Sequence, residues 1–298
     1  MLLDSPALWY RAFHGVPDSV RSPQGEPVNA VRGFIDIVAR VIRDNSPSRL
    51  VATVDLDWRP AFRVAAVPSY KLHRTLEGGA EAEPPELAPQ VAVIYEVLEA
   101  LGIAVIGAEG YEADDVIGTL AMREAGPVDI VTGDRDLLQL VRDDRPVRIL
   151  YAVEKMKVYG EQEVSAKHGI PGRAYADFAV LRGDPSDGLP GVKGIGEKTA
   201  AALVSRFGSI EGVMAALDRG VEDGFPAGAR AKLEAARDYL AVAPAVSRVV
   251  CDLPVPQLPD ALPRVPKDPA TLLALSDRWG LESPLERMLQ ALEVAHSG

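Results

Sequence analysis

Nine acidic side chains in this sequence have the types and positions to hold metal ions. They are Asp4, Asp55, Glu112, Asp114, Asp115, Asp134, Asp136, Asp184 and Asp187. Carboxylate oxygens without cysteine or histidine neighbours select Mg²⁺ or Mn²⁺ over zinc. Two such ions roughly 4 Å apart can polarise a scissile phosphate, activate water and stabilise the leaving oxygen. The pattern therefore indicates phosphodiester hydrolysis with two or more divalent ions in one site.

Each acid on its own also has an ordinary structural explanation. A lone Asp4 or Asp55 is more often a helix cap than a metal ligand. The stretch from Glu112 to Asp115 could be a capped first turn of a helix, and "GDRD" at 133–136 could be a polar turn. The recurrence of acids at successive strand ends favours the metal site, because nine carboxylates on one rim would repel one another unless cations held them.

The acids follow short apolar runs that predict the strands of a sheet. These runs lie at 1–4, 50–55, 103–107, 128–134 and 147–152, and segments of helical period lie between them at 28–44 and 89–102. Alternating strands and helices predict a doubly wound α/β domain with a mostly parallel sheet. The carboxyl ends of such strands face the ligand crevice, and the acids stand at those ends.

The second half of the sequence has a different pattern. From about Glu161, helical segments follow one another to the end, interrupted by the proline-rich stretch 251–269. We therefore expect an α/β core over residues 1–170 and a helical domain over residues 171–298, with the last helices packing back on the core. A Gly-, Pro- and Glu-rich stretch at 75–89 is too long for a simple turn.

Composition narrows the classes of function. The chain of 298 residues has one cysteine and four scattered histidines, which excludes an intramolecular disulfide framework and argues against a zinc site. The sequence has no export signal and no apolar run of membrane-span length, so we expect a cytoplasmic, nucleoid-associated protein with no membrane partner. A net charge of −11 argues against a nucleic-acid partner, but nine acids bound to metal ions would leave the remaining surface close to neutral.

The stretch "GVKGIGEKT" at 191–199 combines glycines with lysines. The residues that could bind phosphates are Gly191, Lys193, Gly194, Gly196 and Lys198. A P-loop is excluded, because Glu197 separates glycine from lysine and no strand precedes the motif. A glycine turn between two helices instead presents backbone N–H groups and lysines to a nucleic-acid backbone without reading bases. The alternative is a tight helix–helix turn with solvated lysines.

Three longer segments resemble the 5'-nuclease family, which includes the 5'→3' exonuclease domain of bacterial DNA polymerase I and the flap endonucleases. They are "GYEADDVIGTLA" at 110–121, "VTGDRDLLQL" at 131–140 and "LRGDPSDGLPGVKGIGEKTA" at 181–200. The resemblance runs along the whole chain and implies a PIN-like sheet with a helical arch at about 63–90. It also implies that the nine acids form a metal cluster and that a helix-three-turn-helix at about 184–208, similar to a helix-hairpin-helix, holds duplex DNA with K⁺ on its carbonyls.

The resemblance also gives roles to the segment "FRVAAVPSYKLHR" at 62–74. It implies that Arg63 and Lys71 contact the scissile phosphate as catalytic residues. It implies that Tyr70 stacks near the reacting nucleotide and that Arg74 steers the 5' strand. Without the family, tyrosine, lysine and arginines at this spacing more often form a solvated surface.

One departure from the family pattern concerns the arch. The chain continues into "EGGAEAEPPE" at 77–86, which we call the acidic segment, where relatives have a basic helix. Negative charge repels a nucleic-acid backbone, so this departure argues against strong capture or threading of a 5' single strand.

The expected protein is a structure-specific 5' nuclease, active as a 5'→3' exonuclease and a 5'-flap endonuclease in replication and repair. We expect a free-standing bacterial member with no polymerase domain after the nuclease, because the sequence ends at Gly298. Its partners would be DNA with 5' ends, flaps, nicks or gaps, and RNA–DNA primer hybrids, and it would act as a monomer. The alternatives are a non-catalytic, structure-specific DNA-binding protein and a PIN-like ribonuclease, which would not need the helical half.

Overall fold

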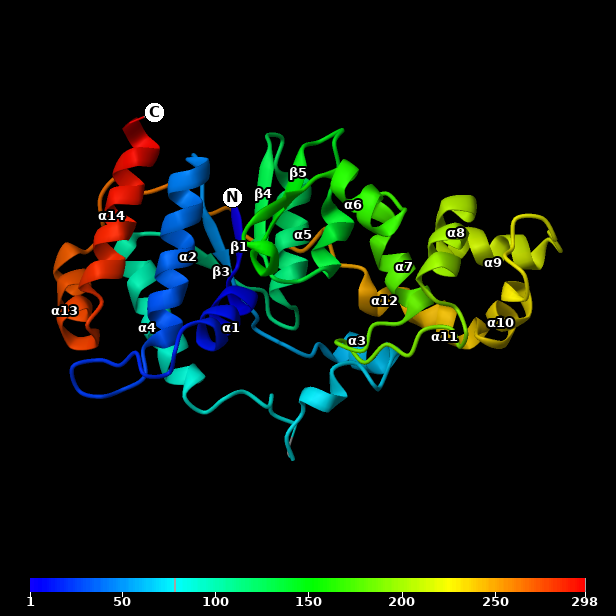
Figure 1. Cartoon of the computed structure of the whole chain (residues 1–298), viewed down its shortest axis with the longest axis horizontal. Helices are drawn as coiled ribbons and strands as arrows, with labels where there is room; N and C mark the ends of the chain where they lie inside the picture. The colour runs from blue at the N-terminus through cyan, green and yellow to red at the C-terminus, as the bar shows by residue number, and fades with distance from the viewer. Residues whose placement is uncertain (78, 298) are drawn as a thin grey trace.

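The computed structural model describes residues 1–77 and 79–297 of the chain (Figure 1). A six-stranded sheet has the strand order β3-β2-β1-β4-β5-β6. The strands are β1 (Leu2–Asp4), β2 (Val51–Thr53), β3 (Ala104–Ile106), β4 (Val128–Thr132), β5 (Val147–Tyr151) and β6 (Lys157–Tyr159). The first five run parallel, and β6 pairs antiparallel with β5. The predicted mostly parallel sheet is confirmed, and β6 is an edge strand that was not predicted.

Side chains of the strands alternate between the two faces of the sheet. Leu2 of β1 and Ile130 of β4 belong to the apolar core on one face. Leu3 and Val131, one residue further along each strand, belong to the core on the other face. Successive side chains therefore point to opposite faces, and both faces of the sheet are buried. For this reason the strands appear in the sequence as continuous apolar runs.

Helices from both ends of the chain cover one face of the sheet. They are α1 (Ser5–Gly15), α2 (Asn29–Asn45), α4 (Leu87–Leu101), α13 (Pro269–Trp279) and α14 (Glu282–Ser297). α14 lies along α2, and α13 packs against α4 (Figure 1). The helices predicted at 28–44 and 89–102 correspond to α2 and α4. The last two helices of the chain therefore complete the core on this face.

The other face is covered by α5 (Ala113–Arg123), and the chain enters its helical half after β6. The remaining helical elements are η2 (Asp136–Leu140), η3 (Ala152–Glu154), α6 (Glu161–His168), η4 (Gly172–Ala174), α7 (Tyr175–Arg182), α8 (Glu197–Phe207), α9 (Ile210–Asp218), α10 (Ala229–Ala235), α11 (Arg237–Val242) and α12 (Pro244–Ser247). Within the described residues no single helix is both long and apolar enough to span a membrane. Only α8 and α9 taken together pass that test, and they are bent by 75°.

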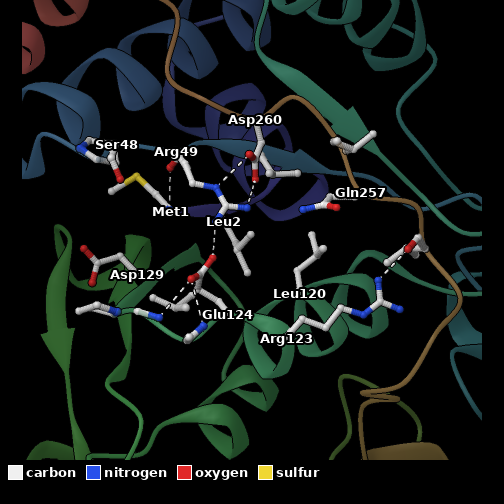
Figure 2. Close-up of a pocket in the computed structure, with 18 of the residues that line it drawn as sticks. Met1, Leu2, Ser48, Arg49, Leu120, Arg123, Glu124, Asp129, Gln257 and Asp260 are labelled. Carbon is white, nitrogen blue, oxygen red and sulfur yellow. Dashed lines mark hydrogen bonds and ion pairs between the residues drawn. The ribbon is translucent and has the colours of Figure 1, made fainter.

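The proline-rich stretch between α12 and α13 passes along the amino ends of the strands. Arg49, just before β2, donates to the two carboxylate oxygens of Asp260 at 2.9 and 2.7 Å and to Glu124 at 2.5 Å (Figure 2). Arg123 donates to the backbone carbonyl of Val255 at 2.7 Å. These bonds border an open pocket of about 820 Å³ and hold the stretch that leads to the last two helices.

The segment expected to form a helical arch is mostly irregular chain. Between α3 (Ala61–Ala66) and α4, the only helical element among the described residues is the 3-10 turn η1 (Leu72–Arg74). The acidic segment carries a Gly-Gly pair and the pair Pro84 and Pro85. Glycine costs about 1 kcal/mol and proline about 3 kcal/mol relative to alanine inside a helix, so this sequence disfavours a helical arch.

Leu292→Ala in α14 is expected to lower the free energy of unfolding by about 2–5 kcal/mol, because this side chain is 1% exposed and belongs to the core shared with α2. Val294→Ala on the same helix removes a side chain that is 50% exposed, and the expected change is at most about 0.5 kcal/mol. Urea denaturation of the two variants measures the difference. Equal effects would mean that α14 does not contribute to the core.

Candidate active site

Neighbouring strand ends bring the first acids together. Asp4 ends β1 and caps α1, where it accepts the N–H of Ala7 at 3.3 Å. The hydroxyl of Thr132, at the end of the adjacent β4, donates to the same carboxylate. Asp55 lies two residues beyond β2 and accepts the N–H of Ala113, the first residue of α5, at 2.6 Å. The parallel sheet therefore delivers both acids to its carboxyl edge.

Five of the nine candidate acids line one open cavity of about 920 Å³. They are Asp4, Asp55, Glu112, Asp114 and Asp134. Burial, with a smaller contribution from nearby carboxylates, raises the pKa of Asp4 to about 7 and that of Asp55 to about 6. The same two causes raise the pKa of Asp114 well above its ordinary value. The cavity therefore holds carboxylates that are costly to ionise in the folded chain, chiefly because they are buried.

Asp136, Asp184 and Asp187 form a second group next to the first. Burial raises the pKa of Asp136 well above its ordinary value, and the neighbouring Asp134 and Asp187 add to this shift. Burial also raises the pKa of Asp187. The side chain of Asp184 is 1% exposed. Because Asp134 lines the cavity and also acts on Asp136, it connects the two groups.

Asp115 is held by an arginine and by two backbone N–H groups. It is fully buried, and the described residues that line the cavity do not include it. One carboxylate oxygen accepts from Arg63 at 2.7 Å and from the N–H of Val250 at 2.8 Å. The other oxygen accepts the N–H of Glu112 at 3.3 Å. Asp115 therefore joins the start of α5 to the segment that follows α12.

Glu112 is held by three side chains of the segment 62–74. Arg63 and Lys71 form ion pairs with its carboxylate, and the hydroxyl of Tyr70 donates to it at 2.5 Å. Arg63 also donates to the backbone carbonyl of Val246 at 3.1 Å. Arg63 and Tyr70 are each 2% exposed, so the phosphate contact and the base stacking expected of them do not match this arrangement. Lys71, in contrast, lines the cavity.

No three Asp, Glu, His or Cys side chains within residues 1–77 and 79–297 are arranged so that they could hold one metal ion. Lys71 and Arg63 supply the positive charge at Glu112. The donor set nevertheless suits a hard divalent cation, because it consists of carboxylate oxygens. Binding such a cation would also favour the ionised forms of Asp4 and Asp55, whose pKa values are raised by burial and, to a smaller extent, by neighbouring carboxylates.

The loop 184–188 is docked on the segment 69–74. Three hydrogen bonds join them: Ser69 Oγ to the carbonyl of Gly188 at 2.8 Å, the N–H of Lys71 to the carbonyl of Asp187 at 2.9 Å, and Arg74 to the carbonyl of Ser186 at 2.8 Å. Arg74, expected to steer a 5' strand, is thus engaged in holding this loop. The position of Asp187 is coupled through the backbone to that of Lys71.

The glycine-lysine turn connects α7 and α8. Its exposed residues are Lys193, Gly194, Gly196, Glu197 and Lys198. Val192 and Ile195 are buried and anchor the turn. Gly191 has φ of +68°, and a Cβ there would lie 2.5 Å from the backbone N of Gly183. Lys232, which no motif marked, donates to the carbonyl of Gly194 at 2.8 Å. The turn therefore presents two lysines to solvent on a tightly packed backbone.

Comparison with known families covers both halves of the chain. Residues 1–169 match the family described as "5'-3' exonuclease, N-terminal resolvase-like domain", and residues 170–270 match "5'-3' exonuclease, C-terminal SAM fold". The chain belongs to the 5'-3' exonuclease family. The resemblance noted in the sequence is confirmed, and this exonuclease combines a resolvase-like sheet with a helical domain.

Individual relatives agree with this assignment. A 5'-3' exonuclease of Streptomyces coelicolor is 54% identical over 300 residues, which cover 98% of this chain and 99% of that protein. DNA polymerase I of Mycobacterium bovis is 37% identical over 306 residues, which cover 99% of this chain and 32% of the polymerase. A flap endonuclease of bacteriophage T5, solved in a pseudo-enzyme–product complex with DNA and metal ions, has the same fold with a TM-score of 0.62 at 16% identity, over 99% of this chain and 98% of that one.

Backbone groups that no motif marks also support the site of this exonuclease. The carbonyl of Val246 and the N–H of Val250 hold Arg63 and Asp115, as described above. Between these two valines, the side chain of Gln139 donates to the carbonyl of Ser247 and accepts the N–H of Val249, each at 3.0 Å. Residue types carry no signal for such contacts, because the partners are main-chain atoms that every residue has.

The metal-free exonuclease is expected to lose thermal stability as the pH rises from about 4 to about 7. The ordinary pKa of both Asp4 and Asp55 is 3.8, and their folded values are about 7 and about 6. The stability that these groups contribute is therefore complete below the ordinary value and lost as the pH rises through the folded values. Melting curves in EDTA measure this loss. The double variant Asp4→Asn/Asp55→Asn should show a smaller fall, and an equal fall in both proteins would contradict the assignment.

Gly188→Ala is expected to separate the loop 184–188 from the segment 69–74, since a Cβ there would lie 2.2 Å from the carbonyl oxygen of Ser69. Displacing a site by about 1 Å can cost roughly 100-fold in rate, so cleavage of DNA should fall by up to that factor. Gly220→Ala is the matched control, because its φ of +68° is close to the +71° of Gly188 but nothing lies within 4 Å of the added Cβ. Similar rates for the two variants would show that the docked loop does not position the site.

Proposed function

We propose that this exonuclease is a structure-specific 5' nuclease that hydrolyses phosphodiester bonds of DNA at 5' ends, flaps, nicks and gaps. The observation that carries the proposal is the cavity of about 920 Å³ in which five acids and Lys71 meet. Such a cavity repels a phosphate alone and accepts it together with divalent cations. The T5 flap endonuclease, whose fold is similar, was solved with DNA and metal ions, and this supports the proposal.

Mg²⁺ or Mn²⁺ is the proposed cofactor, with two or more ions in the site. The proposed ligands are Asp4, Asp55, Glu112, Asp114 and Asp134, which line the cavity, and the adjacent Asp136, Asp184 and Asp187. Asp115 is proposed to act on this set through Arg63 and Glu112. When bound, the ions supply charge neutralisation and Lewis acidity at the phosphate.

Lys71 is the proposed catalytic cation of the chain itself. Burial alone lowers its pKa, but nearby carboxylates, Glu112 first, more than offset this, so the pKa is raised and the ammonium stays protonated at neutral pH. A protonated lysine on the cavity wall can stabilise negative charge that develops on a phosphate. Arg63 and Tyr70 are proposed to position Glu112, because both are buried against it.

The glycine-lysine turn is the proposed grip on the DNA backbone. Lys193 and Lys198 are exposed, and Gly196 precedes the first turn of α8, whose free N–H groups favour a phosphate. A K⁺ ion on the turn, RNA–DNA primer hybrids as substrates and a monomeric state belong to the same proposal. In this division of roles the acids at the edge of the sheet, with Asp184 and Asp187, form the site that cuts, and the turn at 191–198 holds the duplex.

Asp114→Asn is expected to lower cleavage of a 5'-flap duplex in Mn²⁺ by more than about 100-fold. Changes to the partners of metal ligands already cost roughly 10- to 100-fold, and loss of a ligand should cost more. Asp143→Asn makes the same chemical change at an exposed residue ahead of β5, at the amino edge of the sheet, and should leave the rate unchanged. Gel analysis of an end-labelled flap measures both rates.

Three results would count against this function. Unimpaired cleavage by Asp114→Asn would contradict the proposed site. Wild-type protein that binds flaps tightly but leaves them intact in both Mg²⁺ and Mn²⁺ would support a non-catalytic DNA-binding protein. A strong preference for single-stranded RNA over flap DNA would support a PIN-like ribonuclease.

A further inference from the structure

The acidic segment folds back toward the active-site cavity through backbone pairing. Thr75 and Glu81 form an antiparallel bridge, and the N–H of Ala82 donates to the carbonyl of Arg74 at 2.7 Å. Figure 1 shows this part of the chain, coloured cyan, between α3 and α4. Because alternate residues of an extended chain point to the same side, the pairing directs Glu81 and Glu83 to one wall.

Glu81 and Glu83 line the same cavity as the candidate metal ligands. Burial raises the pKa of Tyr10 in α1, and Glu81 and Glu83 raise it further, so both carboxylates lie close to that hydroxyl. Burial also raises the pKa of Glu81 to about 7, with Glu83 as the next cause. Two carboxylates therefore share one wall of a cavity that is already rich in acids.

The basic side chains that line this cavity are Lys71, Arg74 and His73, and the first two are engaged with other partners. Lys71 pairs with Glu112. Arg74 donates to the carbonyl of Ser186 at 2.8 Å and lies 3.9 Å from the carboxylate of Asp187. Both cations lower the pKa of Glu81 less than its burial raises it. A phosphate passing this wall would therefore meet negative charge that the chain does not neutralise.

The rest of this wall suits an uncharged ring better than a phosphate. Tyr10 and Tyr95 line it and are half-buried, whereas Trp9, whose ring meets Tyr95 edge to face with centroids 6.0 Å apart, is 6% exposed and belongs to the core. Trp9 Nε1 is buried and has no hydrogen-bond partner in the described part of the chain. Aromatic faces stack on bases, and carboxylates accept amino N–H groups from base edges. The two tyrosines can therefore contact a terminal unpaired base, whereas the two carboxylates repel a row of phosphates.

We propose that Glu81 and Glu83 are specificity-determining residues, which select 5' ends at nicks and very short flaps against long 5' single strands. A long single strand along this wall would bring several phosphates close to the two carboxylates. A nick brings none there, because its 5' strand stays paired. The proposal rests on the proposed 5'-nuclease function and narrows its substrate class.

The double variant Glu81→Gln/Glu83→Gln tests this role. The measured quantity is the ratio of kcat/KM for a long single-stranded 5' flap to kcat/KM for a nicked duplex, at about pH 8, where Glu81 is ionised. We expect the ratio to rise roughly 10-fold at low ionic strength and the gain to shrink with added salt. The single variants should each give a smaller rise.

The matched control is Glu77→Gln/Glu86→Gln, which removes the same charge from exposed residues of the acidic segment that do not line the cavity. Its ratio should stay at the wild-type value. An unchanged or lower ratio for the cavity pair overturns the proposal, and so does an equal rise in both double variants. Failure of the wild type to cut either substrate would contradict the proposed function, whereas intact nick cleavage with an unchanged ratio contradicts only the role of the two glutamates.

Discussion

The crowding of carboxylates in one cavity at the carboxyl edge of the sheet is the constraint around which this exonuclease is built. Burial raises the pKa values of Asp4, Asp55 and Asp114, so the fold holds these acids together against their own electrostatics. Within the chain, Lys71 and Arg63 form ion pairs with Glu112 and offset its negative charge. The remaining negative charge allows the cavity to bind divalent cations. With these cations bound, the cavity can also accept a phosphodiester.

Keeping these carboxylates close together requires a rigid backbone around them. Asp4 is fixed by its place at the junction of β1 and α1, and the first turn of α5 stabilises acids through its helix dipole. The docked loop 184–188 joins this edge to the glycine-lysine turn, because the carbonyl of Asp187 accepts the N–H of Lys71. A displacement of the turn would therefore change the position of acids and of Lys71 together.

The strands, the acids at their ends and the glycine-lysine turn could be predicted from the sequence, because each depends on a local pattern. The burial of Arg63 and Tyr70 could not, since it depends on Glu112, which lies 49 and 42 residues away. The same is true of Asp115, whose partners include the N–H of Val250. The sequence showed the charge of the acidic segment, but only the fold shows that two of its glutamates enter the cavity.

Anomalous scattering from crystals grown with Mn²⁺ tests most directly whether cations relieve the repulsion in the cavity. The expected result is one or more anomalous peaks among Asp4, Asp55, Asp114 and Asp134. Peaks confined to exposed carboxylates elsewhere, with the ion pair between Lys71 and Glu112 intact and no Mn²⁺ in the cavity, would contradict the role given to these acids.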